Sequence, residues 1–446
     1  MTMKNYKLSI SLGLVALMGI STLYQFSDRL ESRKSYENDV AQAREQVETG
    51  LNEDAERSYL KALERCPNLD LYKELGGFYM DRGETRSAAK LYRNVMQDKF
   101  PEDPETYLYG IDIYLKDGRV REAFEAYHEG KERCKNSAGL DEAIKPHWYD
   151  FTLSERFEDV RPYSRSCRLA AVCDSGIWYY VNEDGRTVIN SGFKEAGAFG
   201  QYAAVVDSAG NAFCIARDGS TKVTSAVIEK ADPEFGKVRR FIAPTGGILA
   251  AYNGRSWNFY DESLKLKCGG YTATTGFSSG VAAVSKDGKK WALISGDGTE
   301  LTDYSFDGAV VDEKGVLCRG KGLFMKKGWN FQLVDTTGVP ITDQTFEEVV
   351  AFNENTLAAV KQGGSWKFIN EAGEITDLGK FQEARSFSAG LAAVKQNDKW
   401  GYIDANGEVA IDFRFQEARD FSDYGTAFVK VENTWRLLQL DRMNYD

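Results

Sequence analysis

The tryptophans of this chain recur at a nearly constant interval, and this spacing constrains the fold more than any other feature. Seven of the eight lie beyond residue 151, where successive gaps are 79, 34, 38, 37, 34 and 35 residues. The first gap is about two intervals long, and Phe213 fills the missing place 35 residues after Trp178. A period of this length predicts one structural unit for each landmark. The seven tryptophans are Trp178, Trp257, Trp291, Trp329, Trp366, Trp400 and Trp435.

One unit is clearest in the segment from Phe381 to Ile411. It reads F-Q-E-A-R-S-F, a turn, L-A-A-V-K, a second turn, K-W-G-Y-I-D, a third turn and E-V-A-I. The runs between turns have the length and the aromatic and β-branched content of short strands. The turns contain Gly390, Asn397 and Gly407, residue types that tolerate positive φ, so antiparallel hairpins are expected.

This pattern resembles the WG-repeat family, in which a Lys-Trp-Gly-like step precedes an aromatic and aliphatic run and a D-x-x-G turn. Trp400-Gly401 carries the literal dipeptide, and the resemblance covers about 290 residues. It implies a β domain of about eight units over residues 151–446. A closed propeller is the favoured arrangement, with each tryptophan anchored in the core against the neighbouring blade; an open spiral of stacked hairpins is the alternative.

A second repeat, of about 34 residues, precedes the β units. Helical patterns over residues 35–150 break at Gly50, Gly83 and Gly118, each suited to a helix C-terminus. The pattern resembles the tetratricopeptide repeat, which implies a short α-solenoid whose concave face binds peptides or proteins. Leu140–Phe151 is expected to form the final capping helix. The core positions expected from this pattern are Tyr79, Ala88, Tyr92, Tyr114 and Ala123.

The amino terminus has the composition of a membrane segment. Leu8–Phe26 is 19 residues long without a charge, and the preceding residues are basic. An uncleaved signal anchor is favoured over a cleaved signal peptide, because bulky residues stand where a small-residue cleavage site would be needed. The expected organisation is an anchor with its flanks over residues 1–34, helical repeats over 35–150 and β repeats over 151–446, with the body outside the cytoplasm.

The sequence offers little material for catalysis. The chain contains only two histidines, His128 and His147, and its seven cysteines form no C-x-x-C pair. The single aspartates of the β turns supply too few oxygens for calcium and fit a turn-stabilising role. We therefore expect no catalytic, cofactor-binding or metal-binding residues. The turn aspartates are Asp184, Asp218, Asp297, Asp335 and Asp404.

The net charge of −11 is spread along the chain, which disfavours nucleic acid as a partner. The favoured hypothesis is a membrane-tethered, bacterial-type scaffold without enzymatic activity that recognises other proteins through both repeat domains. The alternative is a cell-wall or carbohydrate-binding surface protein that uses exposed aromatic side chains of the β domain. A third hypothesis places an enzyme site at the centre of a propeller, where several carboxylates would have to converge.

Overall fold

The structure is a computed structural model that describes residues 32–163, 167–245, 247–313, 315–317, 320–353 and 357–443. It divides into a helical unit that ends at Trp148 and a β unit that begins at Tyr149. The predicted anchor, Leu8–Phe26, lies outside the described residues. Within those ranges, no helix is both long enough and apolar enough to cross a membrane.

The helical unit starts with a helix described over residues 32–48 and continues as a series of short helices. Gly83 and Gly118 follow the ends of two of them with φ of 72°, a backbone angle that glycine adopts without strain. The side chains of Asn68 and Asp103 accept N–H bonds at two helix starts. The helices are α2 (Asn52–Arg65), α3 (Leu69–Asp81), α4 (Thr85–Leu91), η1 (Tyr92–Met96, a π-helical turn), α5 (Gln97–Lys99), α6 (Pro104–Lys116), α7 (Val120–Arg133), α8 (Ala138–Ile144) and the 3₁₀ turn η2 (Lys145–His147).

The five predicted core positions of this unit are all buried, which confirms the helical reading of the pattern. Close approach between helices depends on small residues: a Cβ on Gly110 of α6 would lie within 3 Å of the Tyr92 ring. The predicted capping helix is only partly correct. Helical structure ends at His147, and Phe151 begins the first β-strand, because Phe151 pairs across the sheet with Leu440.

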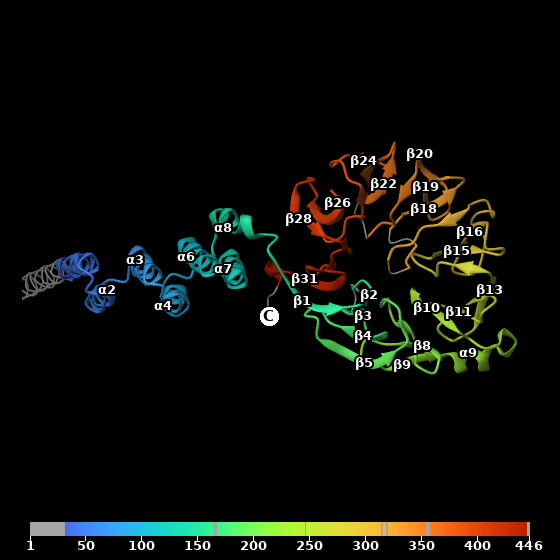
Figure 1. The fold of residues 1–446 in the computed structure, drawn as a ribbon, viewed down its shortest axis with the longest axis horizontal. Helices are drawn as coiled ribbons and strands as arrows, with labels where there is room; N and C mark the ends of the chain where they lie inside the picture. The colour runs from blue at the N-terminus through green and yellow to red at the C-terminus, as the bar shows by residue number, and fades with distance from the viewer. Residues whose placement is uncertain are drawn as a thin grey trace, which may run out of the picture. The chain divides into compact units, whose positions relative to one another are not determined.

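The described β residues form eight antiparallel sheets arranged as the blades of a closed propeller (Figure 1). The open-spiral alternative is therefore wrong. Strands are named inner, second, third and outer from the axis outward. Blade 1 contains β2 (Asp159–Val160), β3 (Ala170–Asp174), β4 (Ile177–Val181) and β5 (Thr187–Phe193); blade 2 contains β6 (Glu195–Ala196), β7 (Ala203–Val206), β8 (Ala212–Ile215) and β9 (Thr221–Thr224); blade 3 contains β10 (Arg240–Thr245), β11 (Ile248–Tyr252), β12 (Trp257–Tyr260) and β13 (Leu266–Tyr271); blade 4 contains β14 (Ala273–Thr274), β15 (Val281–Ser285) and β16 (Trp291–Ser295).

Two short helical segments, α9 (Ser225–Ala231) and η3 (Pro233–Phe235), lie between blades 2 and 3, and a third, η4 (Asp441–Met443), follows the last strand. The second half of the ring repeats the strand order of the first. Blade 5 contains β17 (Gly308–Ala309), β18 (Gly322–Lys327), β19 (Asn330–Asp335) and β20 (Pro340–Phe346); blade 6 contains β21 (Glu348–Val349), β22 (Ala358–Gln362), β23 (Ser365–Ile369) and β24 (Ile375–Thr376); blade 7 contains β25 (Glu383–Ala384), β26 (Leu391–Gln396), β27 (Lys399–Asp404) and β28 (Val409–Phe415); blade 8 contains β29 (Glu417–Ala418), β30 (Thr426–Val431), β31 (Thr434–Leu440) and β1 (Phe151–Phe157).

The ring is closed by pairing between the first and the last strand of the β unit. Blade 8 takes its outer strand, β1, from the start of the unit, and β1 pairs with β31 in antiparallel register from Phe151↔Leu440 to Phe157↔Trp435. Figure 1 shows these two strands side by side. The sequence repeat is therefore offset by one strand from the blade. Four phenylalanines that open a repeat each end the outer strand of the preceding blade: Phe157, Phe193, Phe346 and Phe415.

In each blade, the first residue of the inner strand pairs with a residue of the second strand. The residue of the third strand that pairs with this same second-strand residue is here called the anchor position. Six tryptophans occupy it, and four of these are nearly fully buried. Trp435 packs against Val160 and Val172 of blade 1, as the propeller reading predicted. The eight occupants are Trp178, Ala212, Trp257, Trp291, Phe331, Trp366, Trp400 and Trp435.

Two landmarks were assigned wrongly. Trp329 is 93% exposed in the turn between β18 and β19, and Phe331, two residues later, takes the anchor position opposite Lys326. In blade 2 the pairing with Val206 places Ala212 there, one residue before Phe213. Both errors follow from turn length, because a hairpin that gains or loses residues shifts the landmark relative to the strand pairing.

A tryptophan pair tests the importance of the anchor position. Replacing Trp400 by alanine leaves a cavity between blades 7 and 8 and is expected to lower the free energy of unfolding by about 3–5 kcal/mol. Trp329→Ala is the matched control and is expected to change it by less than about 0.5 kcal/mol, because that side chain is exposed. Urea denaturation followed by tryptophan fluorescence measures both. Equal losses in the two variants would contradict the assignment.

Two glycines test the packing of the helical unit. Gly110→Ala forces a methyl group against the buried Tyr92 ring and is expected to destabilise this unit by about 1–3 kcal/mol. Gly77→Ala, within α3, meets no atom within 4 Å and is expected to stabilise it by up to about 1 kcal/mol. Thermal melts followed by helical circular dichroism measure both changes. A stabilising effect of Gly110→Ala would show that the helices are farther apart than described.

Candidate functional site: the hairpin face of the propeller

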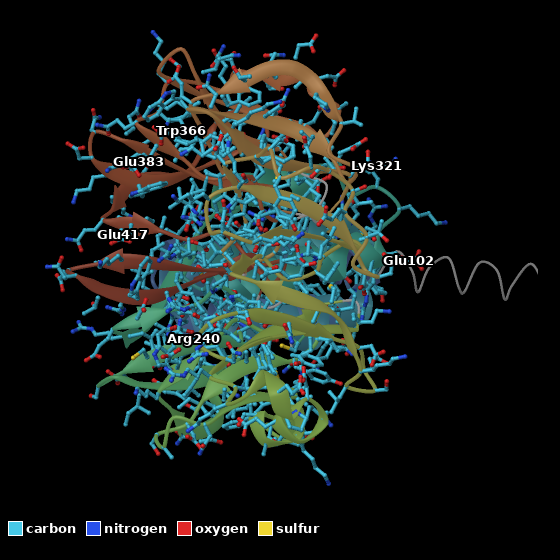
Figure 2. The ribbon with its side chains drawn as sticks, turned by 90° about the vertical axis from the view of Figure 1, so that its right-hand side faces the viewer. Glu102, Arg240, Lys321, Trp366, Glu383 and Glu417 are labelled. Atoms are coloured by element: carbon cyan, nitrogen blue, oxygen red, sulfur yellow. The ribbon has the colours of Figure 1, made fainter. Side chains whose placement is uncertain are left out.

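The turns between the second and third strands of the blades lie on one face of the ring, here called the hairpin face. Figure 2 shows Arg240, Trp366, Glu383 and Glu417 on this side, and Lys321 on the opposite side. The residues of the hairpin face come from two places in each blade, the start of the inner strand and the turn above it.

A polar side chain at the start of the inner strand fixes the hairpin turn in five blades. Each accepts a hydrogen bond from a backbone N–H of the turn, and each directly follows the phenylalanine that opens the repeat. The sequence feature that encodes this bond is thus the Gln, Glu or Asp after that phenylalanine. The pairs, as acceptor and donor, are Glu158 and Gly176 (3.2 Å), Asp307 and Gly328 (2.8 Å), Glu347 and Gly364 (3.2 Å), Gln382 and Asp398 (2.8 Å), and Gln416 and Asn433 (2.7 Å).

In blades 6 to 8, three residues lie side by side at the hairpin-face ends of the inner, second and third strands. A glutamate on the inner strand pairs with a half-buried lysine on the second strand, and the lysine lies beside the anchor tryptophan. Hydrogen bonding to Glu383 raises the pKa of the Lys395 ammonium group, so the lysine stays charged. The glutamates remain about half exposed. The lysine Nζ to glutamate Oε1 distances are 2.6 Å for Lys361 and Glu348, 2.7 Å for Lys395 and Glu383, and 2.6 Å for Lys430 and Glu417.

Nearer the axis, an ion-pair cluster links blades that are distant in sequence. Arg419 Nη1 donates to Glu313 Oε1 at 2.6 Å, and Arg385 Nε donates to Asp420 Oδ1 at 2.7 Å. Arg385 also pairs with Glu313. Burial lowers the pKa of the Arg385 guanidinium, but Asp420 and Glu313 outweigh that effect and raise it. Each carboxylate is thus matched by a guanidinium, an arrangement that holds blades 5, 7 and 8 together.

A hollow of about 410 Å³ opens beside the inner strand of blade 2. Blade 2 is the blade with alanine at the anchor position; this alanine is buried in a cluster that includes Phe235 and Phe241 and does not line the hollow. The walls include two tryptophans and two arginines, Trp178 and Arg161 from blade 1 and Trp257 and Arg240 from blade 3. The sequence analysis did not predict this site, whose walls come from three neighbouring blades.

Each arginine on the wall of the hollow also lies near an acidic side chain. The Arg161 guanidinium lies 4.6 Å from the Trp178 ring centroid and 3.3 Å from Asp159 Oδ2. Arg240 Nη2 lies 3.5 Å from Glu195 Oε1, with both side chains largely exposed. Exposed ion pairs of this kind are weak and exchange readily with other partners. The arrangement suits a ligand that offers a carboxylate to a guanidinium and an apolar group to the indoles.

The residues considered for chemistry in the sequence do not assemble into one site. Asp335 and Asp404 each accept N–H bonds from their own turns, with Asp335 Oδ1 2.8 Å from the Thr337 nitrogen. Asp218 and Asp297 do the same, and Asp184 lies within 3.4 Å of the Asn182 amide. Among the described residues, no group of three or more His, Cys, Asp or Glu side chains could hold a metal ion.

The remaining candidates are the two histidines, both in the helical unit, and the cysteines. His128 of α7 lies edge-on to Tyr127, and burial lowers the pKa of its imidazole. His147 ends the 3₁₀ turn η2. Cysteines within the described ranges are present as free thiols; burial raises the pKa of Cys214 to about 12, so this thiol stays protonated at neutral pH.

Comparison with known proteins supports the reading of the β unit. A family model described as "WG containing repeat" matches residues 333–366, 368–400 and 400–435. These segments run from the third strand of blade 5 to the third strand of blade 8. The β unit is a propeller with WG repeats. No curated protein matches the chain.

Two solved structures are similar to the WG-repeat propeller at low sequence identity. The computationally designed Ika8 protein is 12% identical, with a TM-score of 0.42, and the match covers 64% of this chain and 96% of that one. BamB from Moraxella catarrhalis is 10% identical, also with a TM-score of 0.42, and the match covers 65% of this chain and 100% of that one.

A second hollow, of about 350 Å³, lies at the outer edge of the propeller where the WG-repeat ring closes. Its walls include Asp150, Asp412 and Asp441, and the Asp441 N–H donates to the Asp150 carbonyl at 2.9 Å. Burial, together with the charge of Asp150, raises the pKa of Asp441 from 3.8 to about 6. Asp441 therefore binds its proton more tightly in the folded chain than in the unfolded chain.

This shift has a predictable effect on stability. The contribution of Asp441 to stability should be greatest below about pH 4, should fall as the pH rises to about 6 and should change little above that, because only the folded state buries this charge. Asp441→Asn is expected to raise the free energy of unfolding at pH 7 by about 1 kcal/mol after allowance for partial exposure, and to give no gain at pH 4. Asp412→Asn, at an exposed position in the same hollow, is the control. Urea denaturation across pH measures both, and a gain for Asp441→Asn that does not depend on pH would contradict the assignment.

Proposed function

We propose that the protein is a non-enzymatic scaffold that binds other proteins through the hairpin face of its propeller and through its helical unit. The observation that carries the proposal is Trp329, which is 93% exposed at the tip of a blade 5 turn. Packing in the core explains the presence of the other repeat tryptophans, but it does not explain the exposed Trp329. Tryptophan and arginine are the residues most enriched at the energetic centres of protein interfaces, and the hollow on the same face presents both.

The helical unit supports the same role. Its helices are joined by ion pairs between neighbouring repeats, with Lys73 Nζ 2.6 Å from Glu105 Oε2 and Arg44 Nη2 2.7 Å from Glu74 Oε2. We take this unit to be a tetratricopeptide-type array, on the basis of the helix lengths, the glycine breaks and the buried Ala and Tyr positions. Such an array would present one face of its first helices to a peptide or protein.

We further propose that Leu8–Phe26 anchors the chain in a membrane and that the two units lie outside the cytoplasm. The support is the uncharged stretch of 19 residues after a basic start. Protease treatment of intact cells tests this arrangement, with complete digestion of both units as the expected result. Protection of the units in intact cells, with digestion only after lysis, would contradict it.

The alternative, recognition of a carbohydrate or cell-wall polymer, also draws support from Trp329, because an exposed indole can stack on a sugar ring. Sugar-binding surfaces use several aromatic rings in a row. On the described hairpin face, the half-buried tryptophans that precede Trp329 are Trp291 of blade 4 and Trp257 of blade 3. The structure therefore offers this alternative one fully exposed ring.

Site-specific photocrosslinking in intact cells separates the two functions. A photoreactive residue at position 329 is expected to capture discrete protein partners. The matched control is position 339, which is 57% exposed in the same blade at the opposite end of the strands, and it is expected to capture far less. Adducts that contain only glycan would support the alternative, and equal protein adducts at both positions would contradict binding through the hairpin face.

A further inference from the structure

Charge is segregated on the hairpin face. In blades 3 to 5, two segments of each blade together carry eight basic side chains and two acidic ones. The first segment is the first residue of the inner strand with the residue before it, and the second is the hairpin from the second-strand partner of the anchor residue to the anchor residue itself. We call this surface the basic sector. Its position in a chain of net charge −11 makes it distinct from the rest of the molecule. The basic residues are Arg239, Arg240, Arg255, Lys286, Lys289, Lys290, Lys326 and Lys327, and the acidic residues are Asp287 and Asp307.

The other blades of the same face have the opposite balance. The equivalent positions of blades 6, 7, 8, 1 and 2 carry eleven acidic and five basic side chains. In blades 6 to 8 the half-buried lysines Lys361, Lys395 and Lys430 are each held by a glutamate, so the exposed groups are mainly carboxylates. The hairpin face is thus divided into a basic and an acidic half.

Part of the basic sector is already paired within the fold. Lys290 Nζ lies 2.7 Å from Asp307, and Lys286 Nζ lies 2.8 Å from Glu300. Asp287 accepts backbone N–H bonds from its own turn, so its charge is partly satisfied there. Four exposed cations form no salt bridge with any residue in the described ranges, and they come from all three blades: Arg239, Arg255, Lys289 and Lys327.

Aromatic surface accompanies these cations. Trp329 protrudes beside Lys327, Trp257 is half-buried and stacked on Tyr252 with ring centroids 4.9 Å apart, and the hollow with Arg240 on its wall borders the sector. Charge alone would attract any anion. Cations interleaved with indole rings favour an anionic chain that also carries apolar side chains.

We propose that the basic sector docks an acidic segment of a partner protein, with apolar side chains of that segment against Trp329 and in the hollow. This inference rests on the proposed function and specifies the chemistry of the partner. A short segment needs only one half of the face. A bilayer or a long nucleic acid would extend over the other half as well, where it would meet the carboxylates of Glu348, Glu383 and Glu417.

Charge reversal tests the inference. The probe is a fluorescein-labelled peptide of glutamates with interspersed leucines, and its binding to the full chain is measured by fluorescence anisotropy at low and at physiological salt. The combined variant Arg239→Glu, Arg255→Glu, Lys289→Glu and Lys327→Glu is expected to weaken binding by about tenfold or more. The matched control reverses Arg217, Lys222, Lys265 and Lys321, exposed cations away from the hairpin face, and is expected to bind as the unmodified chain does.

Each outcome has a defined meaning. Circular dichroism and thermal melts must first show that both variants fold. Equal losses in the two variants would overturn the inference, because they would show attraction by net charge alone. Tighter binding of single-stranded DNA or of phosphatidylserine vesicles, lost in the same variant, would also overturn it. Absence of peptide binding while position 329 still captures proteins in cells would overturn the acidic segment and leave the proposed function standing.

Discussion

Pairing between β1 and β31 is the interaction on which the β unit depends. It joins residues nearly 290 positions apart and leaves the ring without an unpaired terminal blade. An open row of the same blades would expose strand edges and the apolar side of an end blade, both of which invite association. Closure also fixes the direction of every blade, and so it places all the hairpin turns on one face. The surface that we propose for binding is therefore a product of closure.

Stability and the proposed recognition depend on different parts of each repeat. The buried tryptophans, the alanine-rich second strands and the capping side chains after the repeat phenylalanine hold the blades together. These positions tolerate little change. The turn residues above them contact mainly solvent, and they can change charge or length without loss of the core. Blade 2 departs from this pattern, because alanine stands in place of tryptophan at its anchor position and a hollow lies beside its inner strand.

The fold could be predicted from the sequence because the interval between tryptophans reflects a local rule, one core indole in each unit. The exact register of the strands could not be predicted in the same way. Trp329 and Phe213 fit the interval approximately, but the pairing within each hairpin decides which residue takes the anchor position. The Glu313 to Arg419 ion pair spans 106 residues and has no local signature. The segregation of charge was hidden for the same reason, because it becomes visible only when turns from separate repeats are brought to one face.

The offset between repeat and blade has a consequence for synthesis. β1 leaves the ribosome near the start of the β unit, but its partner β31 emerges almost at the end. Until then β1 is an unsatisfied strand edge, and a chain released early has no means of covering it. The ring can therefore close only after translation has reached residue 440. Quality-control proteases that recognise exposed strand edges would distinguish finished chains from interrupted ones.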